Sequence, residues 1–181
     1  VGCDVFETNQ VERRVVVRAL EAMGAAGVPF HLLPGNHDPL DAGSVFRSST
    51  FVRHRPDNVH VLDGGHPVVV APGVELVAAP WRSKRPLVDL FRDAAEGLDA
   101  DGTVRILVGH GAVDALSPDR HDPALVSLAS AEAALADGRI HYVALGDRHS
   151  TTSVGQSGRI WYSGAPEPTA DDEGDPGNVL V

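Results

Sequence analysis

Several features that mark common protein classes are missing from this chain of 181 residues. It has a single cysteine, Cys3, so no internal disulfide can form, which agrees with a reducing compartment. No apolar run approaches the length of a membrane-spanning helix, and the start of the chain lacks the basic, apolar and small-residue zones of a signal peptide. We therefore expect a cytoplasmic protein with no membrane association.

Basic charge is also scarce. The formal net charge is -10, whereas a protein that grips nucleic acid through bulk electrostatics needs a basic face. Any contact with DNA must therefore be local. Residues 42–92 are the exception, because they carry an excess of basic side chains whose one compact cluster is Arg82-Ser83-Lys84-Arg85. This cluster is either a solvated loop or a phosphate contact, and Arg82 is the candidate substrate-binding residue within it.

Two familiar catalytic signatures are absent as well. The chain contains neither a Walker pattern nor Gly-x-Gly-x-x-Gly, so no glycine-rich phosphate loop is predicted. It has no serine in a Gly-x-Ser-x-Gly elbow, which leaves a Ser-His-Asp hydrolase without support.

The composition is that of a folded protein, since 43% of the residues are hydrophobic. A chain of this length buries one core well and two cores poorly, so we expect a single domain over residues 1–181.

Apolar periodicity predicts an α/β fold in which helices alternate with short strands. The run at 11–23 has helical spacing, with Thr8 or Asn9 as the expected N-cap, and residues 39–58 are expected to form a long loop with one helical turn near 44–48. Further helices are expected at 87–98 and 130–136, and strands at 28–33, 59–62, 67–71, 74–79, 104–108, 140–145, 159–162 and 178–181.

Four apolar runs end in a glycine flanked by side chains that can bind a metal. These ends are Gly2-Cys3-Asp4, Gly35-Asn36-His37-Asp38, Gly109-His110 and Gly146-Asp147-Arg148-His149. Strand ends of a parallel or mixed sheet meet at one edge, so these side chains are expected to converge. Carboxylate, amide and imidazole donors together suit manganese, iron or zinc rather than calcium alone.

The order of these motifs resembles that of the calcineurin-like metallophosphoesterases. The family pattern is Asp-x-His, Gly-Asp-x-x-Asp, Gly-Asn-His-Asp/Glu, a lone His, and Gly-His-x-His. The segments 142–146 and 161–167 are similar to the DNA-repair exonuclease (SbcD-like) branch. The resemblance implies a four-layer αββα sandwich in which two divalent metals activate a water against a phosphate ester.

The resemblance also implies roles for individual residues. Asp4 matches the carboxylate that bridges both metals, and Glu7 stands where the pattern has its second Asp. His37 matches the group that meets the phosphate and protonates the leaving oxygen, with Asp38 orienting it. Arg148 is a second candidate substrate-binding residue. The implied metal ligands are Asp4, Asn36, His110, Asp147 and His149.

Three departures from the family pattern limit what it implies. Cys3 stands where the pattern has glycine, and Asp147 replaces an imidazole with a carboxylate, which weakens the Lewis acidity of the metal it binds. No Asp-x-His segment is present, so the resemblance implies an N-terminally incomplete domain that lacks a β-α-β unit. We therefore expect one well-held metal at most.

The sequence favours a metal-dependent phosphodiesterase, as an exonuclease or nuclease acting on DNA. Two alternatives stay open: a catalytically impaired module of the same fold that binds a metal or a partner, and a phosphoesterase for small phosphate esters. Family resemblance also implies an ATPase partner subunit. A homo-oligomer is a further option, because a missing inner strand would expose apolar surface.

Overall fold

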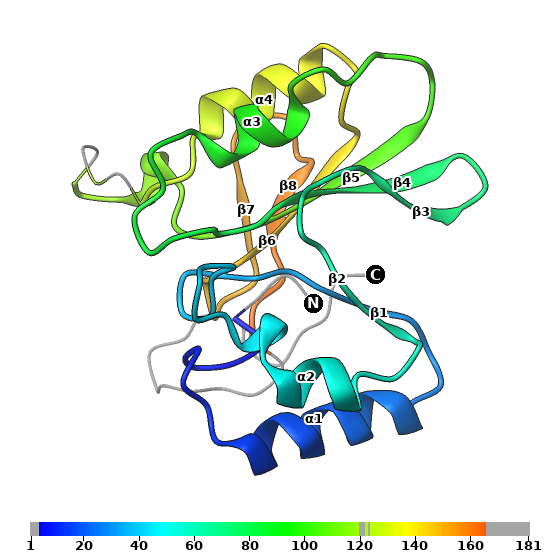
Figure 1. The fold of residues 1–181 in the computed structure, drawn as a ribbon. Helices are drawn as coiled ribbons and strands as arrows, with labels where there is room; N and C mark the ends of the chain where they lie inside the picture. The colour runs from blue at the N-terminus through cyan, green and yellow to red at the C-terminus, as the bar shows by residue number, and fades with distance from the viewer. Residues whose placement is uncertain (1–3, 120–121, 123, 166–181) are drawn as a thin grey trace.

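The computed structural model describes residues 4–119, 122 and 124–165. The expected strand at 178–181, Cys3 and the last two residues of the segment 161–167 that carries part of the family resemblance lie outside the described residues. Within them, the chain has a mixed α/β fold with one six-stranded sheet, one two-stranded sheet and four α-helices (Figure 1). No helix among the described residues is long and apolar enough to cross a membrane.

The larger sheet is mixed, with parallel strands inside and antiparallel strands at both edges. The four inner strands run parallel to one another, which requires connections that return the chain to the same end of the sheet. In spatial order its strands are β3 (Val68–Ala71), β4 (Val74–Ala79), β5 (Val104–His110), β6 (Tyr142–Gly146), β8 (Ile160–Tyr162) and β7 (Thr152–Val154).

Helices α3 (Leu90–Ala95) and α4 (Leu128–Ala136) cover one face of this sheet (Figure 1). Phe91 of α3 packs in one buried cluster with Leu107 of β5 and Leu135 of α4. Each such side chain contributes roughly 1.5–3 kcal/mol when fully buried. Gly109 permits this packing, since a Cβ there would overlap the ring of Phe91.

The smaller sheet joins β1 (Phe30–Leu32) and β2 (Val59–Val61) in parallel, and α1 (Arg13–Ala25) and α2 (Ser49–His54) pack beside it. Valine and leucine at helical spacing on α1 bury Val16 and Leu20 against Leu32 and Val59. The periodicity at 11–23 therefore predicted both the helix and its buried face.

A third buried cluster connects the two sheets. Leu33 and Leu62, which follow β1 and β2, pack against Ala78 of β4 and Val108 of β5. The small sheet with its helices therefore lies against the face of the large sheet that α3 and α4 leave uncovered (Figure 1). This contact fixes the ends of β1 and β5 relative to each other.

Three local expectations were wrong. The helical turn expected near 44–48 is confirmed as a short 3-10 helix (Val45–Arg47), but the rest of residues 39–58 is not a long loop, because it contains α2, whose N-cap Ser48 accepts the Phe51 N–H. The strand β7 was not expected at all, because its three residues carry only one buried apolar side chain. Glu12, rather than Thr8 or Asn9, is the N-cap of α1.

The start of β5 is held by the buried guanidinium group of Arg105. Arg105 is 6% exposed, and its side chain donates to Glu75 Oε2 at 2.9 Å, to the Asp99 carbonyl at 2.6 Å and to Asp101 Oδ2 at 2.9 Å. The neighbouring strand β4 and the loop before β5 are thereby joined to one cation.

We predict that Arg105→Leu lowers the free energy of unfolding by about 3 kcal/mol, because it leaves the partly buried Glu75 carboxylate without its counterion. Urea denaturation measures the change. Arg92→Leu, at an exposed position on α3, is the matched control and should change it by at most about 0.5 kcal/mol. Equal urea midpoints for the two variants would contradict the role assigned to Arg105.

The hydrogen bonds around Arg105 also predict that the free energy of unfolding depends on pH. Hydrogen bonds from the Thr103 N–H and from Arg105 lower the pKa of Asp101 from 3.8 to about 2. A lowered folded-state pKa stabilises the fold above pH 3.8, and this stabilisation disappears as the pH falls through about 2. Wild type should therefore exceed Asp101→Asn in stability at neutral pH, and the difference should shrink in acid; urea titrations across this range test it. A difference that stays constant would exclude the linkage.

Candidate functional site

The predicted metal ligands lie where β1, β5 and β6 end. His110 is the last residue of β5 and is 1% exposed; it lies in register with Gly146, which ends β6 and precedes Asp147. Gly35 and Asn36 follow β1 in the smaller sheet. The packing of the two sheets therefore brings these strand ends to one place, as the sequence predicted.

Three side-chain oxygens surround the Nε2 atom of His110. Asn36 Oδ1 lies 2.9 Å away, Asp4 Oδ2 3.3 Å and Asp147 Oδ1 3.8 Å. Asn36 Oδ1 is an acceptor at hydrogen-bond distance, so the proton on Nε2 is donated to it, whereas Asp147 Oδ1 lies beyond hydrogen-bond distance. A cation at this position would replace that proton. The structure thus brings together four of the five residues that the sequence predicted as ligands.

Gly35 allows the Asp4 carboxylate to reach this position. A Cβ on Gly35 would overlap Asp4 Oδ1, and it would lie 3.0 Å from Asp4 Cγ and 3.1 Å from His110 Cδ2. The backbone N–H of His37 also donates to Asp4 Oδ1 at 3.1 Å. Any other residue at position 35 would displace the carboxylate from the imidazole.

Asp38 has a different role from the one expected. Its side chain is fully buried and accepts from the Gly35 N–H at 2.8 Å, the Phe6 N–H at 2.9 Å and the Val5 N–H at 3.0 Å. The carboxylate therefore joins the segment that carries Asp4 to the loop that carries Asn36. Because both of its oxygens are occupied by backbone groups, Asp38 does not orient His37.

Glu7 takes the place beside His37 that was assigned to Asp38. The Nδ1 atom of His37 lies 3.1 Å from the Glu7 carbonyl oxygen and 3.4 Å from Glu7 Oε1. The His37 side chain is 47% exposed, so its ring faces solvent rather than the protein interior. A proton on Nδ1 would be held by Glu7, and the Nε2 atom is directed away from that contact.

Trp81 was missed by the sequence analysis, although it connects the loops of the site. Its indole Nε1–H donates to the His110 carbonyl at 2.7 Å, its backbone N–H donates to the Pro34 carbonyl at 3.1 Å, and its carbonyl accepts the Leu40 N–H at 2.8 Å. A lone tryptophan after a strand carries no motif. Only its burial, with 1% exposed, and these contacts reveal the role.

The carboxylates of the site respond differently to burial. Burial raises the pKa of Asp147, the charge of Asp4 adds to this, and the opposing charges of His110, His149 and Arg148 do not cancel it. Burial also raises the pKa of Asp4, but the hydrogen bond and charge of His110 outweigh it and leave that pKa lowered. Asp4 is therefore the carboxylate that stays ionised beside the imidazole.

Asp147 also has an unusual backbone. Its φ angle is 104°, in a region that L-residues rarely adopt, and it is the only described residue other than glycine with a positive φ. Such strain persists only where the surroundings enforce it, and it concentrates at functional sites.

The remaining predicted residues lie at the margin. Arg148 and His149 are exposed, and both are close enough for their charges to lower the pKa of Asp147. Arg82 is exposed and donates to the Asp63 carbonyl at 2.6 Å; it lines a cavity of about 590 Å³ beside α3 that does not include His37. The structure therefore does not place Arg82 at the strand-end cluster.

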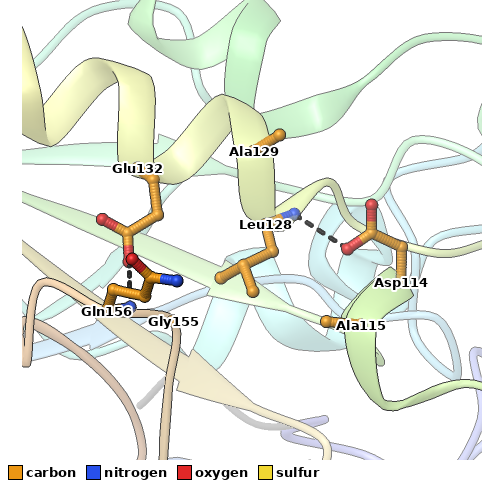
Figure 2. Close-up of a pocket in the computed structure, with 7 residues that line it drawn as sticks. All are labelled: Asp114, Ala115, Leu128, Ala129, Glu132, Gly155 and Gln156. Atoms are coloured by element: carbon orange, nitrogen blue, oxygen red, sulfur yellow. Dashed lines mark hydrogen bonds between the residues drawn. The ribbon is translucent and has the colours of Figure 1, made fainter.

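The structure has two other hollows, of which one includes a candidate site residue. His37 lines a cavity of about 350 Å³ together with Lys84 and residues 8–10 and 41–43. A hollow of about 530 Å³ lies between α4 and residues 155–156 (Figure 2). In the latter, Glu132 accepts the Gln156 N–H and Asp114 accepts the Leu128 N–H, and its lining includes no basic side chain, so we assign it no role.

The donor atoms around His110 match only part of the ligand arrangement that a metal ion needs. In the part of the chain that the structure describes, no group of three or more His, Cys, Asp and Glu side chains is arranged to hold a metal ion. The amide oxygen of Asn36, which is not among those residue types, is the donor nearest to His110. Donors that bind one cation at about 2.1 Å lie about 3 Å apart when they are adjacent. The separations of Asn36 and Asp4 from His110 match this spacing, and that of Asp147 exceeds it.

We predict that Asp38→Asn lowers the free energy of unfolding by about 2 kcal/mol, because the amide nitrogen would face a backbone N–H and leave at least one buried donor unpaired. Thermal or urea denaturation measures it. Asp63→Asn is a control that removes the same charge from an exposed turn, where the Asn oxygen can still accept the Gly65 N–H. If Asp38→Asn is no less stable than this control, Asp38 does not join the two segments.

No protein-family model matches the chain, and no curated protein matches it either.

Proposed function

We propose that this chain is a metal-dependent phosphodiesterase of the calcineurin-like metallophosphoesterase family, with DNA as the substrate. The observation that carries the proposal is the meeting of the Asp4, Asn36 and Asp147 oxygens around His110 Nε2, from four segments that are distant in sequence. The order of these residues along the chain is the family order.

The packing of the elements supports the same assignment. Two sheets face each other through the Leu33 and Val108 cluster, and helices cover the outer face of each. We infer that this is the αββα sandwich of that family. The candidate ligands lie at the carboxyl ends of the strands, where open α/β sheets bind their ligands.

The residues present can be assigned to a hydrolytic reaction. Asp4, Asn36 and His110 would hold a divalent cation such as manganese, which would polarise the phosphoryl group and lower the pKa of a water molecule. His37 is the proposed general acid, since its exposed ring can give a proton to the leaving oxygen. Glu7, beside Nδ1, would hold the ring in the orientation that presents Nε2 to substrate.

The test is hydrolysis of bis(4-nitrophenyl) phosphate and of linear DNA by the full chain, first stripped with EDTA and then supplied with Mn²⁺. We expect turnover only with added metal, and a fall in kcat of about a hundredfold or more for His37→Ala. His66→Ala removes an exposed histidine outside the site and should leave kcat unchanged. Equal turnover by wild type and His37→Ala would refute the assignment.

A second candidate function is a module of the same fold that binds a metal or a partner without turnover. The finding that favours it is the absence, among the described residues, of three ligating carboxylates and imidazoles around one point. Metal content after dialysis against Mn²⁺, measured together with turnover, separates the two candidates. Turnover with at least one bound ion per chain supports the enzyme, whereas one ion or none without turnover supports the module.

A further inference from the structure

Lys84 is the only lysine in the chain, since the other basic residues are arginines. It lies on the loop between β4 and α3 and is exposed. None of the ion pairs among the described residues involves Lys84. An ammonium group that has no counterion among the described residues and that borders a cavity can bind an anion from solution.

The loop presents its basic side chains to two different cavities. Ser83 Oγ donates to the Arg85 carbonyl at 2.8 Å and accepts the Arg85 N–H at 3.1 Å, which closes a tight turn around Lys84. Arg82 and Arg85 line the cavity beside α3, whereas Lys84 lines the cavity of about 350 Å³ that also includes His37. Of the basic residues in this turn, Lys84 is therefore the one that shares a cavity with the candidate general acid.

Another part of the lining of the His37 cavity is held in place by Asn9. Its Oδ1 accepts the Val45 N–H at 2.9 Å, and its Nδ2 donates to the Pro39 carbonyl at 3.0 Å and to Asp41 Oδ1 at 3.2 Å. Asp41 brings a negative charge to this part of the lining, and its Oδ1 is bound by Asn9 and by the Gly43 N–H at 2.8 Å. The cavity is thus formed before any ligand arrives, and its volume lies within the range of small-ligand sites.

We propose that Lys84 is a specificity-determining residue whose ammonium group binds a second phosphoryl group of the substrate, next to the one that His37 meets. This inference rests on the proposed phosphodiesterase function and deepens it. A substrate with consecutive phosphates, such as a polynucleotide, would engage both residues. A simple diester would engage His37 alone, so Lys84 would select the longer substrate.

The first experiment needs no turnover. Sulfo-NHS acetate acylates Lys84 and, apart from it, only the N-terminal amine, and peptide mass spectrometry separates the two products. With EDTA present, we expect a short single-stranded oligonucleotide to slow acylation of Lys84 about tenfold. An unchanged rate would overturn the proposal. Equal protection by inorganic phosphate at the same concentration would overturn the part that requires consecutive phosphates.

The second experiment compares kinetic selectivity. The selectivity is the kcat/KM for the oligonucleotide divided by the kcat/KM for bis(4-nitrophenyl) phosphate. In Lys84→Ala this selectivity should fall about tenfold, mainly because KM for the oligonucleotide rises. A tenfold change is the size expected for the loss of one charged hydrogen bond. Lys84→Arg should restore most of the selectivity. Arg85→Ala is the matched control, because it removes the same charge from the same loop but on the side of the other cavity.

Salt dependence gives an independent measure of binding. The logarithm of the oligonucleotide binding constant falls as the logarithm of the salt concentration rises, and each phosphate contact to a single strand makes this slope steeper by about 0.7. Lys84→Ala should therefore make the slope shallower by about 0.7, and Arg85→Ala should leave it unchanged. If wild type turns over substrate and Lys84→Ala changes neither the selectivity nor the salt slope, the role of Lys84 is refuted but the enzyme function is not. Protection of Lys84 without any metal-dependent turnover would refute the enzyme function and keep the phosphate site.

Discussion

The arrangement of the strand ends depends on Trp81, whose polar groups connect the two sheets. Its indole N–H holds the carbonyl at the end of β5, while its backbone N–H and carbonyl hold the loop that follows β1. Because the indole is buried, water does not compete for these bonds, and losing one would leave a buried carbonyl unpaired. This connection holds Asn36 beside His110, since Asn36 lies in the loop after β1 and His110 is the end of β5, and Trp81 binds both segments.

The site concentrates negative charge in a small volume. Asp4, Asp38 and Asp147 are at least partly buried near one imidazole, and burial raises the pKa of Asp38 and Asp147. In Asp38, three backbone N–H groups oppose the effect of burial without cancelling it. A cluster of this kind is more stable when a cation shares the space, because unpaired carboxylates are costly away from water. The crowding of these groups leaves no room for a side chain at Gly35, because a Cβ there would overlap Asp4 Oδ1.

Much of the framework could be predicted from the sequence, because apolar periodicity reports which face of an element is buried. The helix at 11–23 and the strands at 104–108 and 140–145 correspond to α1, β5 and β6, and glycine-linked polar residues correctly marked the strand ends that converge. The pairing of Asp38 with His37 failed because adjacency in sequence says nothing about which way two side chains point on a turn. Asn9 failed as an N-cap because bonds to the distant residues Pro39 and Val45 outweighed the local preference.

The positive φ of Asp147 has a consequence for the history of the protein. Glycine adopts this backbone conformation without steric cost, so a mutation to glycine would relieve strain and make the fold more robust. Selection for durability alone would therefore drive the aspartate out of this position. An aspartate that persists there among related chains would be evidence that evolution has kept a less stable molecule for the sake of its carboxylate.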